Sequence, residues 1–367
     1  MNNRLQSLDI FRGLTIAFMI LVNTPGDWSI AYNMLEHAKW HGFTPTDLVF
    51  PSFVFITGVS TWFSLKSYNH MFSTDLLLKI WKRTLIIFLL GVALYAFPFY
   101  NRPLSTWRIL GVLQRIALCY GIGATLSLFL NKKQIIGLSA ILLLGYWFIL
   151  MQFGDLSLTN NAVLKLDLLL FGESHLYHGE GLAFDPEGLL STLPSLVTFF
   201  IGYLVGQYLG QTSDRNVVFK NLIIWSVLLI IGGLVWHISF PINKKLWTSS
   251  YVLLVGGLSM LIFALCFYLV DILQIKKWGK PFVVFGTNAI LAYMVSEFLI
   301  ICLSEFVRVQ DAPDITIDGH EALYRYGFSL WMGRNEFASF MFAFVYMAVC
   351  WLIVYMFYRK NIFLKVG

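Results

Sequence analysis

A short polar loop between two apolar runs carries the residues best suited to chemistry. The runs cover residues 14–22 and 48–59, and the loop contains His37 and ends near Asp47. An imidazole exchanges protons near neutral pH and can form an acyl-imidazole, so His37 is a candidate general base or nucleophile. Asp47 could fix the tautomer of that imidazole. The alternative is a loop histidine at a membrane interface beside Trp40, with no role in chemistry.

Metal binding is a second chemistry that this loop could support. His37 and His41 are four residues apart, which would place both side chains on one face if the loop were helical. No third ligand is evident, so we expect no metal.

A further pair of polar residues lies well inside another apolar run. This pair is Gln114 and Arg115, and an arginine at membrane depth normally faces the protein interior and has a partner. The partner could be a substrate, which would make both residues part of a pocket. It could equally be a carboxylate, for instance Glu297 or Glu305.

Two acidic residues precede the sixth apolar run, in the sequence Asp185-Pro186-Glu187-Gly188. Pro and Glu are common in the first turn of a helix, so these residues are expected either to cap that helix or to line a pocket.

Three basic residues come from opposite ends of the chain: Arg4, Arg12 and Lys365. They could bind phosphate, because arginine makes bidentate contacts with phosphate and lysine supplies a point charge. They could also reflect only the enrichment of basic residues on the cytoplasmic side of membrane proteins.

The composition is that of a polytopic membrane protein. Of the 367 residues, 58% are hydrophobic and 13% are charged, against about 25% charged in an ordinary soluble domain. The net charge of +6 comes mostly from basic residues beside apolar runs, so no nucleic-acid partner is indicated. The four cysteines lie in apolar runs, which indicates packing residues rather than disulfides. We expect one integral-membrane domain in a lipid bilayer.

About ten transmembrane helices are predicted, from the need for roughly 20 apolar residues per span. The predicted spans are residues 8–23, 45–65, 83–99, 105–130, 135–152, 189–209, 221–240, 249–269, 281–306 and 337–357. The first is expected to be a retained helix rather than a signal peptide. The predicted fold is therefore an all-α bundle. The bias of Lys and Arg among the loops favours both termini in the cytoplasm and the His37 loop on the far side.

Two long loops lie on that far side and could cover a pocket. They cover residues 153–188, which include an amphipathic piece at 162–171, and residues 307–336. Loops of this length are usually functional or mobile.

Six sequence blocks resemble one known family in order along the chain. They are RLQSLDIFRGLTIAFMILVN, EHAKWHGFTPTDLVFPSFVFITG, RILGVLQRIALCY, FDPEGLLSTL, NKKLWTSSYV and YRKNIFLK, between residues 4 and 365. Together they resemble the membrane domain of the heparan-alpha-glucosaminide N-acetyltransferase family, and in particular its bacterial members.

The resemblance implies acetyl transfer across a membrane by a single transmembrane acyltransferase domain over residues 1–367. Acetyl-CoA would be the co-substrate, and the acceptor would be the amino group of a glucosamine-type sugar. The resemblance assigns His37, Asn23 and Asp47 to the catalytic site, and Arg4, Arg12 and Lys365 to the CoA phosphates. The resemblance is to bacterial members, and helical spans imply the inner membrane of a bacterial cell as the location. A homodimer is left open.

Two other functions remain open from the sequence. One is a transporter or flippase without acyl chemistry, with Arg115 and Glu297 on its path. The other is an envelope polysaccharide O-acyltransferase with a hydroxyl acceptor. Trp40, Gln114, Arg115, Asp185 and Glu187 are the further pocket candidates.

Overall fold

The described chain forms two compact units that alternate along the sequence. The computed structural model describes residues 5–364. Within that range, unit 1 contains residues 5–37, 44–49 and 269–364, and unit 2 contains residues 38–43 and 50–268. The His37 loop therefore begins and ends in unit 1, while residues 38–43 belong to unit 2.

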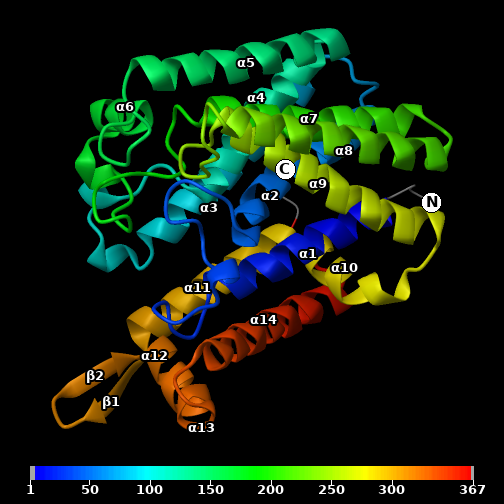
Figure 1. Ribbon diagram of the computed structural model, residues 1–367. Helices are drawn as coiled ribbons and strands as arrows, with labels where there is room; N and C mark the ends of the chain where they lie inside the picture. Colours follow the sequence, from blue (N-terminus) through cyan, green and yellow to red (C-terminus); the bar gives the residue numbers. More distant parts are fainter. Residues whose placement is uncertain (1–4, 365–367) are drawn as a thin grey trace. The chain divides into compact units, whose positions relative to one another are not determined.

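Unit 1 is built around helix α1 (Gln6–Asn23), which packs mainly on α10 (Lys280–Thr287) and also contacts α11 (Ala289–Phe306) and α14 (Glu336–Arg359). Figure 1 shows α1, α11 and α14 running along one another. The remaining elements of this unit are η1 (Asn33–Leu35), η2 (Pro45–Leu48), η7 (Lys277–Gly279), α12 (Gly319–Tyr324), η8 (Arg325–Ser329) and α13 (Leu330–Met332).

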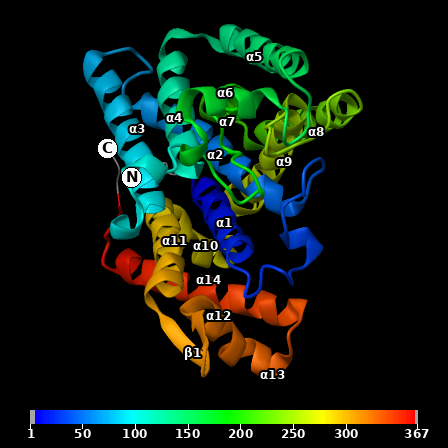
Figure 2. The same ribbon diagram turned by 90° about the vertical axis from the view of Figure 1, so that its left-hand side faces the viewer.

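A β-hairpin in unit 1 departs from the all-helical prediction. Strands β1 (Arg308–Ala312) and β2 (Ile315–Asp318) pair antiparallel, and Figure 2 shows them beyond α12. The physical cause is local, since Val309, Thr316 and Ile317 are β-branched and Pro313-Asp314 forms the turn.

Unit 2 contains the remaining long helices. They are α2 (Val49–Lys66), α3 (Thr74–Ala96), α4 (Val112–Phe129), α5 (Lys132–Gln152), α6 (Ala162–Phe171), α7 (Thr192–Gln211), α8 (Arg215–His237) and α9 (Ser249–Phe267); the short helices are η3 (Phe99–Asn101), η4 (Leu104–Thr106) and η5 (Glu173–His175). The chain continues from α9 into the π-helical turn η6 (Tyr268–Ile272), whose residues from Leu269 on belong to unit 1. The consecutive pairs α3–α4 and α8–α9 pack together, and α7 contacts α4, α5 and α9.

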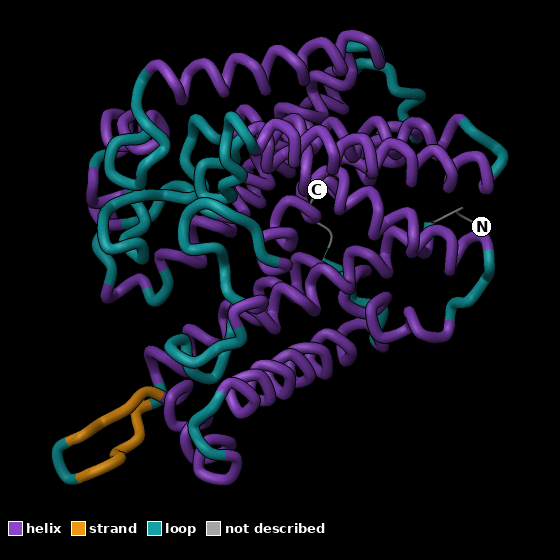
Figure 3. The backbone as a smooth tube through the Cα atoms, viewed as in Figure 1, coloured by secondary structure: helices purple, strands orange, loops and turns teal. Residues whose placement is uncertain are grey.

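The long loops of unit 2 gather at one end of its helices, as Figure 3 shows. These loops cover residues 97–111, 153–161, 172–191 and 238–248. They belong to the segments that the charge bias assigns to one side of the membrane, so the predicted alternation of spans agrees with the packing of this unit.

Within residues 5–364, eight helices are long and apolar enough to cross a membrane, by length and composition. They are Pro45–Lys66, Val112–Phe129, Lys132–Gln152, Thr192–Gln211, Arg215–His237, Ser249–Ile272, Ala289–Phe306 and Glu336–Arg359. Each corresponds to a predicted span. The other two predicted spans form helices α1 and α3, and the amphipathic piece at 162–171 is helix α6. The predicted multi-pass helical architecture is confirmed, whereas the number ten is not.

Two predicted spans have different boundaries in the structure. The span 105–130 is helical only from Val112. The span 281–306 is two helices that meet at Asn288, whose backbone is not helical. The side chain of Asn288 donates to the carbonyl oxygen of Ile362 (2.8 Å) and accepts from the N–H of Leu364 (2.9 Å). This side chain bonds to the C-terminal segment at the break between the two helices.

Glycine allows α1 and α10 to meet backbone to backbone. A Cβ atom on Gly13 would lie 1.8 Å from the carbonyl oxygen of Phe282, and one on Gly286 would lie 1.8 Å from the carbonyl oxygen of Asp9. Only glycine fits at either position without moving a helix.

The substitution Gly13→Ala is therefore expected to lower the free energy of unfolding by about 1–3 kcal/mol or more, because the added methyl group overpacks this contact. Thermal unfolding of the detergent-solubilised protein measures the change. Gly145→Ala in α5 is the matched control, because no atom lies within 4 Å of its added Cβ, and alanine favours a helix over glycine. Equal melting temperatures for the two variants would contradict the close contact.

Candidate active site

An imidazole–carboxylate pair closes the loop between α1 and α2. His37 Nδ1 lies 2.8 Å from Asp47 Oδ1. A carboxylate only accepts, so Nδ1 carries the proton and Nε2 carries the lone pair when the ring is neutral. The Asp47 side chain is 1% exposed, while the His37 side chain is 40% exposed. A buried carboxylate thus orients an imidazole that stays accessible.

Local sequence explains why Asp47 is held in place. Thr44-Pro45-Thr46-Asp47 forms a capping box at the start of η2, with Pro45 in its first turn. The N–H of Thr44 donates to Asp47 Oδ2 at 3.0 Å, and the Thr44 hydroxyl donates to the carbonyl oxygen of Glu36 at 2.6 Å. These bonds join the two ends of the loop, so the orientation of His37 follows from a short sequence motif.

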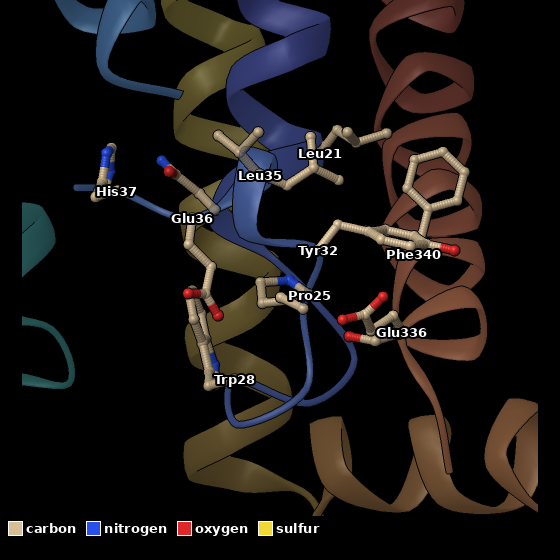
Figure 4. A pocket seen from close by; sticks show the side chains of 14 residues that line it. Leu21, Pro25, Trp28, Tyr32, Leu35, Glu36, His37, Glu336 and Phe340 are labelled. Atoms are coloured by element: carbon tan, nitrogen blue, oxygen red, sulfur yellow. The ribbon is translucent and has the colours of Figure 1, made fainter. Parts of the chain in front are cut away.

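His37 lines a pocket of about 330 Å³ in unit 1. The wall is formed by the end of α1, the segment that follows it and the first turns of α14, and it includes Asn23. The segment after α1 is attached to α14, since the N–H of Gly26 donates to the carbonyl oxygen of Ser339 (3.2 Å). Figure 4 shows His37 at one edge of this pocket. Two of the three predicted catalytic residues therefore face one cavity, and the third, Asp47, contacts His37.

His37 and His41, which were considered as a metal-binding pair, do not share a helical face. Residues 37–41 are not helical, so the spacing does not bring the two histidines onto one face. His41 instead has its Nδ1 3.3 Å from the side-chain nitrogen of Asn243 in unit 2.

Arg12 lies at the junction of α10 and α11. Its Nη1 donates to Asp9 Oδ1 (3.1 Å) and to the carbonyl oxygen of Gly286 (3.0 Å). Asn288 holds Leu364 at the same junction, so Arg12 and the described end of the C-terminal segment lie close together. Arg4 and Lys365, the other predicted phosphate ligands, lie outside the described residues.

Asp185 and Glu187 do not cap a helix, because α7 begins at Thr192. Both bind Arg108 instead. Arg108 Nε and Nη2 donate to the two oxygens of Asp185 (2.8 and 2.7 Å), and Nη2 also donates to Glu187 Oε2 (2.7 Å). The guanidinium lies over the rings of Tyr95 and Tyr177, 4.7 Å from each centroid. Burial raises the pKa of the Asp185 carboxyl; Arg108 opposes this rise and Glu187 adds to it.

Arg115 is bound by neutral groups rather than by a carboxylate. Its guanidinium donates to the carbonyl oxygen of Gly188 (2.7 Å) and to the hydroxyls of Ser191 and Ser195, and it lies over the ring of Trp247. These contacts fix the segment that enters α7. None of these contacts is the ion pair with Glu297 or Glu305 that was considered from the sequence.

The other two predicted pocket residues also lie in unit 2. Gln114 is fully buried, and neither atom of its side-chain amide has a partner among the described residues. Trp40 donates its Nε1–H to the carbonyl oxygen of Leu156 (2.7 Å) and packs edge-on against Phe184. Trp40 is thus a packing residue of unit 2.

Comparison with known proteins agrees with the resemblance seen in the sequence. A profile described as "Heparan-alpha-glucosaminide N-acetyltransferase, catalytic" matches residues 4–237. The chain belongs to this family. Heparan-alpha-glucosaminide N-acetyltransferase of Mus musculus is 32% identical over 358 residues, covering 81% of this chain and 54% of the mouse protein. The Homo sapiens protein is 31% identical, covering 80% of this chain and 53% of its own length.

The chain thus spans about half the length of the curated N-acetyltransferases that it matches. The profile match includes the His37 loop, the Arg108 cluster and Arg115.

Sequence reasoning missed several residues of this family member's pocket. Glu36, Trp28 and Tyr32 line it from the segment after α1, and Glu336 and Phe340 line it from α14. Glu36 is adjacent to His37, so its proximity in the sequence could have suggested it. Glu336 is about 300 residues away, and nothing in its local sequence distinguishes it from an ordinary acidic residue in a first helical turn.

Asp167, a buried carboxyl in α6, should make the stability of this fold depend on pH. Asp167 Oδ1 accepts from the N–H of Leu189 (3.0 Å), while Oδ2 is buried without a hydrogen-bond partner among the described residues. Burial raises the pKa of Asp167 to about 7; Leu189 opposes the rise, Asp185 adds to it and Arg115 opposes it.

Stability is expected to fall as the pH rises from about 4 to about 7, because an acid with a raised folded pKa favours the fold only while it is protonated. Asp167→Asn should flatten this part of the profile, measured as melting temperature against pH. Asp155→Asn is the control. Its carboxylate is exposed and has a pKa lowered by hydrogen bonds from Ser157 and Asn160. Its effect on stability therefore falls mainly below about pH 4, and the profile between pH 4 and pH 7 should not change. An unchanged slope in Asp167→Asn would contradict the assignment.

Proposed function

We propose that this protein is a transmembrane acetyltransferase that moves acetyl from acetyl-CoA to the amino group of a glucosamine-type sugar. The observation that carries the proposal is the His37–Asp47 pair at 2.8 Å beside a pocket, in a member of an N-acetyltransferase family. An accessible imidazole, oriented by a buried carboxylate, is the arrangement that general base catalysis requires.

In the proposed step His37 Nε2 accepts a proton from the acceptor amine while the amine nitrogen attacks the thioester carbonyl. The C–N bond forms and the C–S bond breaks. CoA leaves as a thiolate, which takes the proton from the His37 imidazolium and becomes the free thiol, so the imidazole is neutral again. Asp47 stabilises the imidazolium that forms, and the amide of Asn23 donates a hydrogen bond to the developing oxyanion, a contact commonly worth about 2.7–4 kcal/mol. We favour this ternary-complex step over an acetyl-histidine intermediate. In the ternary complex a neutral imidazole only has to accept a proton, whereas the intermediate requires it to attack the thioester as a nucleophile.

We further propose how the substrates approach. Acetyl-CoA enters from the cytoplasm, its phosphates bound by Arg4, Arg12 and Lys365, and both termini lie on that side. Arg12 supports this assignment by its place beside the C-terminal segment. The protein then acts as a single transmembrane acyltransferase domain with about ten spans in a bacterial inner membrane, and His37 serves an acceptor on the far side.

Acceptor-dependent release of CoA thiol from acetyl-CoA tests the proposal. The purified, detergent-solubilised full chain is supplied with glucosamine, N-acetylglucosamine or glucose. Release with glucosamine alone is expected, because the second sugar has a blocked amine and the third offers only hydroxyls. Release with glucose at a similar rate would favour an O-acyltransferase, and no release from folded protein that does not bind acetyl-CoA would overturn the enzyme assignment.

A further inference from the structure

The lining of the pocket beside His37 is negatively charged. Two carboxylates, those of Glu36 and Glu336, line it. Neither makes a hydrogen bond or an ion pair with another described residue, and no lysine or arginine is among the described lining residues. In Figure 4 the two carboxylates lie on opposite sides of Pro25. A ligand in this pocket therefore meets negative charge from two separate elements, the loop before His37 and the first turn of α14.

The nearest basic side chain in the sequence does not offset these charges. Arg334 comes two residues before Glu336, but its Nε donates to Asp27 Oδ2 at 2.8 Å, and its Nη2 lies 2.8 Å from the same oxygen. That pairing neutralises Asp27 instead. The described lining of the pocket thus contains two carboxylates and no lysine or arginine.

The other walls of the pocket suit a sugar. Trp28, Tyr32 and Phe340 line it, and the rings of Tyr32 and Phe340 meet edge to face with centroids 6.3 Å apart. Aromatic faces can pack against the C–H groups of a sugar ring. A volume of about 330 Å³ lies at the small end of the range of ligand pockets, roughly 300–1,000 Å³. The size indicates one or two sugar units rather than a polymer.

We propose that this pocket is the acceptor subsite, and that Glu36 and Glu336 select a small cationic amino sugar and reject sulfated or carboxylated ones. The proposal rests on the proposed acetyl transfer and specifies its substrate class. The two carboxylates attract an ammonium group and repel an anionic substituent on the same sugar. The bound ammonium loses one proton to solvent, and the neutral amine that results is the nucleophile of the proposed step. They are specificity residues, and His37 performs the chemistry at the edge of the same pocket.

Two acceptors with the same amine test the selection: glucosamine and glucosamine 6-sulfate. The measured quantity is the ratio of their kcat/KM values, which should favour the unsulfated sugar in the wild type. Glu36→Gln and Glu336→Gln should each lower this ratio by about threefold, as expected for partly exposed charges, and the double variant by about tenfold. The change should lie mainly in KM.

Charge reversal separates selection from a structural role. Glu336→Lys should increase kcat/KM for the sulfated acceptor above the wild-type value, which a damaged fold cannot do. Glu336 also lies in the first turn of α14, where a carboxylate stabilises the helix, so the melting temperature of each variant is measured as well. Glu321→Gln is the matched control, because Glu321 lies in unit 1 and does not line the pocket; its ratio should equal that of the wild type.

Calorimetric binding of the two sugars to the full chain tests the selection without turnover. Tighter binding of glucosamine, lost in the double variant, supports the proposal even if acetyl transfer is never observed. Equal binding of both sugars, or a ratio that no variant changes while the wild type still acetylates glucosamine, overturns the proposal and leaves the proposed function intact.

Discussion

Replacing His37 with alanine is expected to lower kcat for acetyl transfer by about 10²–10⁴-fold, the usual contribution of a positioned general base. The fold should persist, because the His37 side chain is 40% exposed and Asp47 still accepts the N–H of Thr44. Acceptor-dependent CoA release measures the rate, and the melting temperature reports the fold.

His41→Ala is the matched control for this prediction. It removes a second imidazole from the same loop, and that imidazole contacts Asn243 rather than Asp47. We expect a rate within a few-fold of the wild type. If His37→Ala keeps more than a tenth of the wild-type rate, His37 is not the base. Asp47→Asn should lower the rate as well, because an amide in place of the carboxylate no longer stabilises the imidazolium.

The predictable part of this structure is the part governed by local sequence. Apolar runs of span length gave the positions of the helices, and the Thr44-Pro45-Thr46-Asp47 sequence is a capping box that places Asp47 within reach of His37. The contact between Asp47 and His37 follows from a separation of only ten residues. The role of the pair in catalysis stays a prediction.

The parts that sequence reasoning missed depend on contacts distant along the chain. Asn288 could not be identified as the end of a helix without knowing that Ile362 and Leu364 dock on it. In the same way, Asp185 and Glu187 resemble a helix cap in the sequence. In the structure both carboxylates accept hydrogen bonds from Arg108, which lies more than 70 residues earlier. A polar side chain within an apolar run indicates that it has a partner, but the sequence does not identify that partner.

The Arg108 cluster yields the prediction with the largest effect on stability. The side chains of Arg108, Asp185 and Glu187 are 14%, 0% and 10% exposed. Removing one partner of a buried ion pair leaves uncompensated charge and typically costs about 3–5 kcal/mol. Arg108→Met should therefore lower the free energy of unfolding by that amount, measured by denaturant titration of the detergent-solubilised protein.

A surface pair in the same chain provides the control. Arg325 pairs with Asp311, but the Arg325 side chain is 51% exposed, so Arg325→Met should cost less than about 1 kcal/mol. Equal losses for Arg108→Met and Arg325→Met would show that the buried cluster contributes no more than a surface contact.

A triple variant shows where the cost of Arg108→Met arises. If the loss comes from stranded carboxylates, Arg108→Met combined with Asp185→Asn and Glu187→Gln should recover much of it, because neutral amides are far less costly to bury than unpaired charges. If the loss instead comes from the packing of the guanidinium between Tyr95 and Tyr177, the triple variant will be no more stable than Arg108→Met alone. The cluster joins the loop before α4 to the segment that enters α7, and the same segment supplies the oxygens that bind Arg115. Recovery of stability in the triple variant would therefore mean that charge balance, rather than ring packing, holds these two segments of unit 2 together.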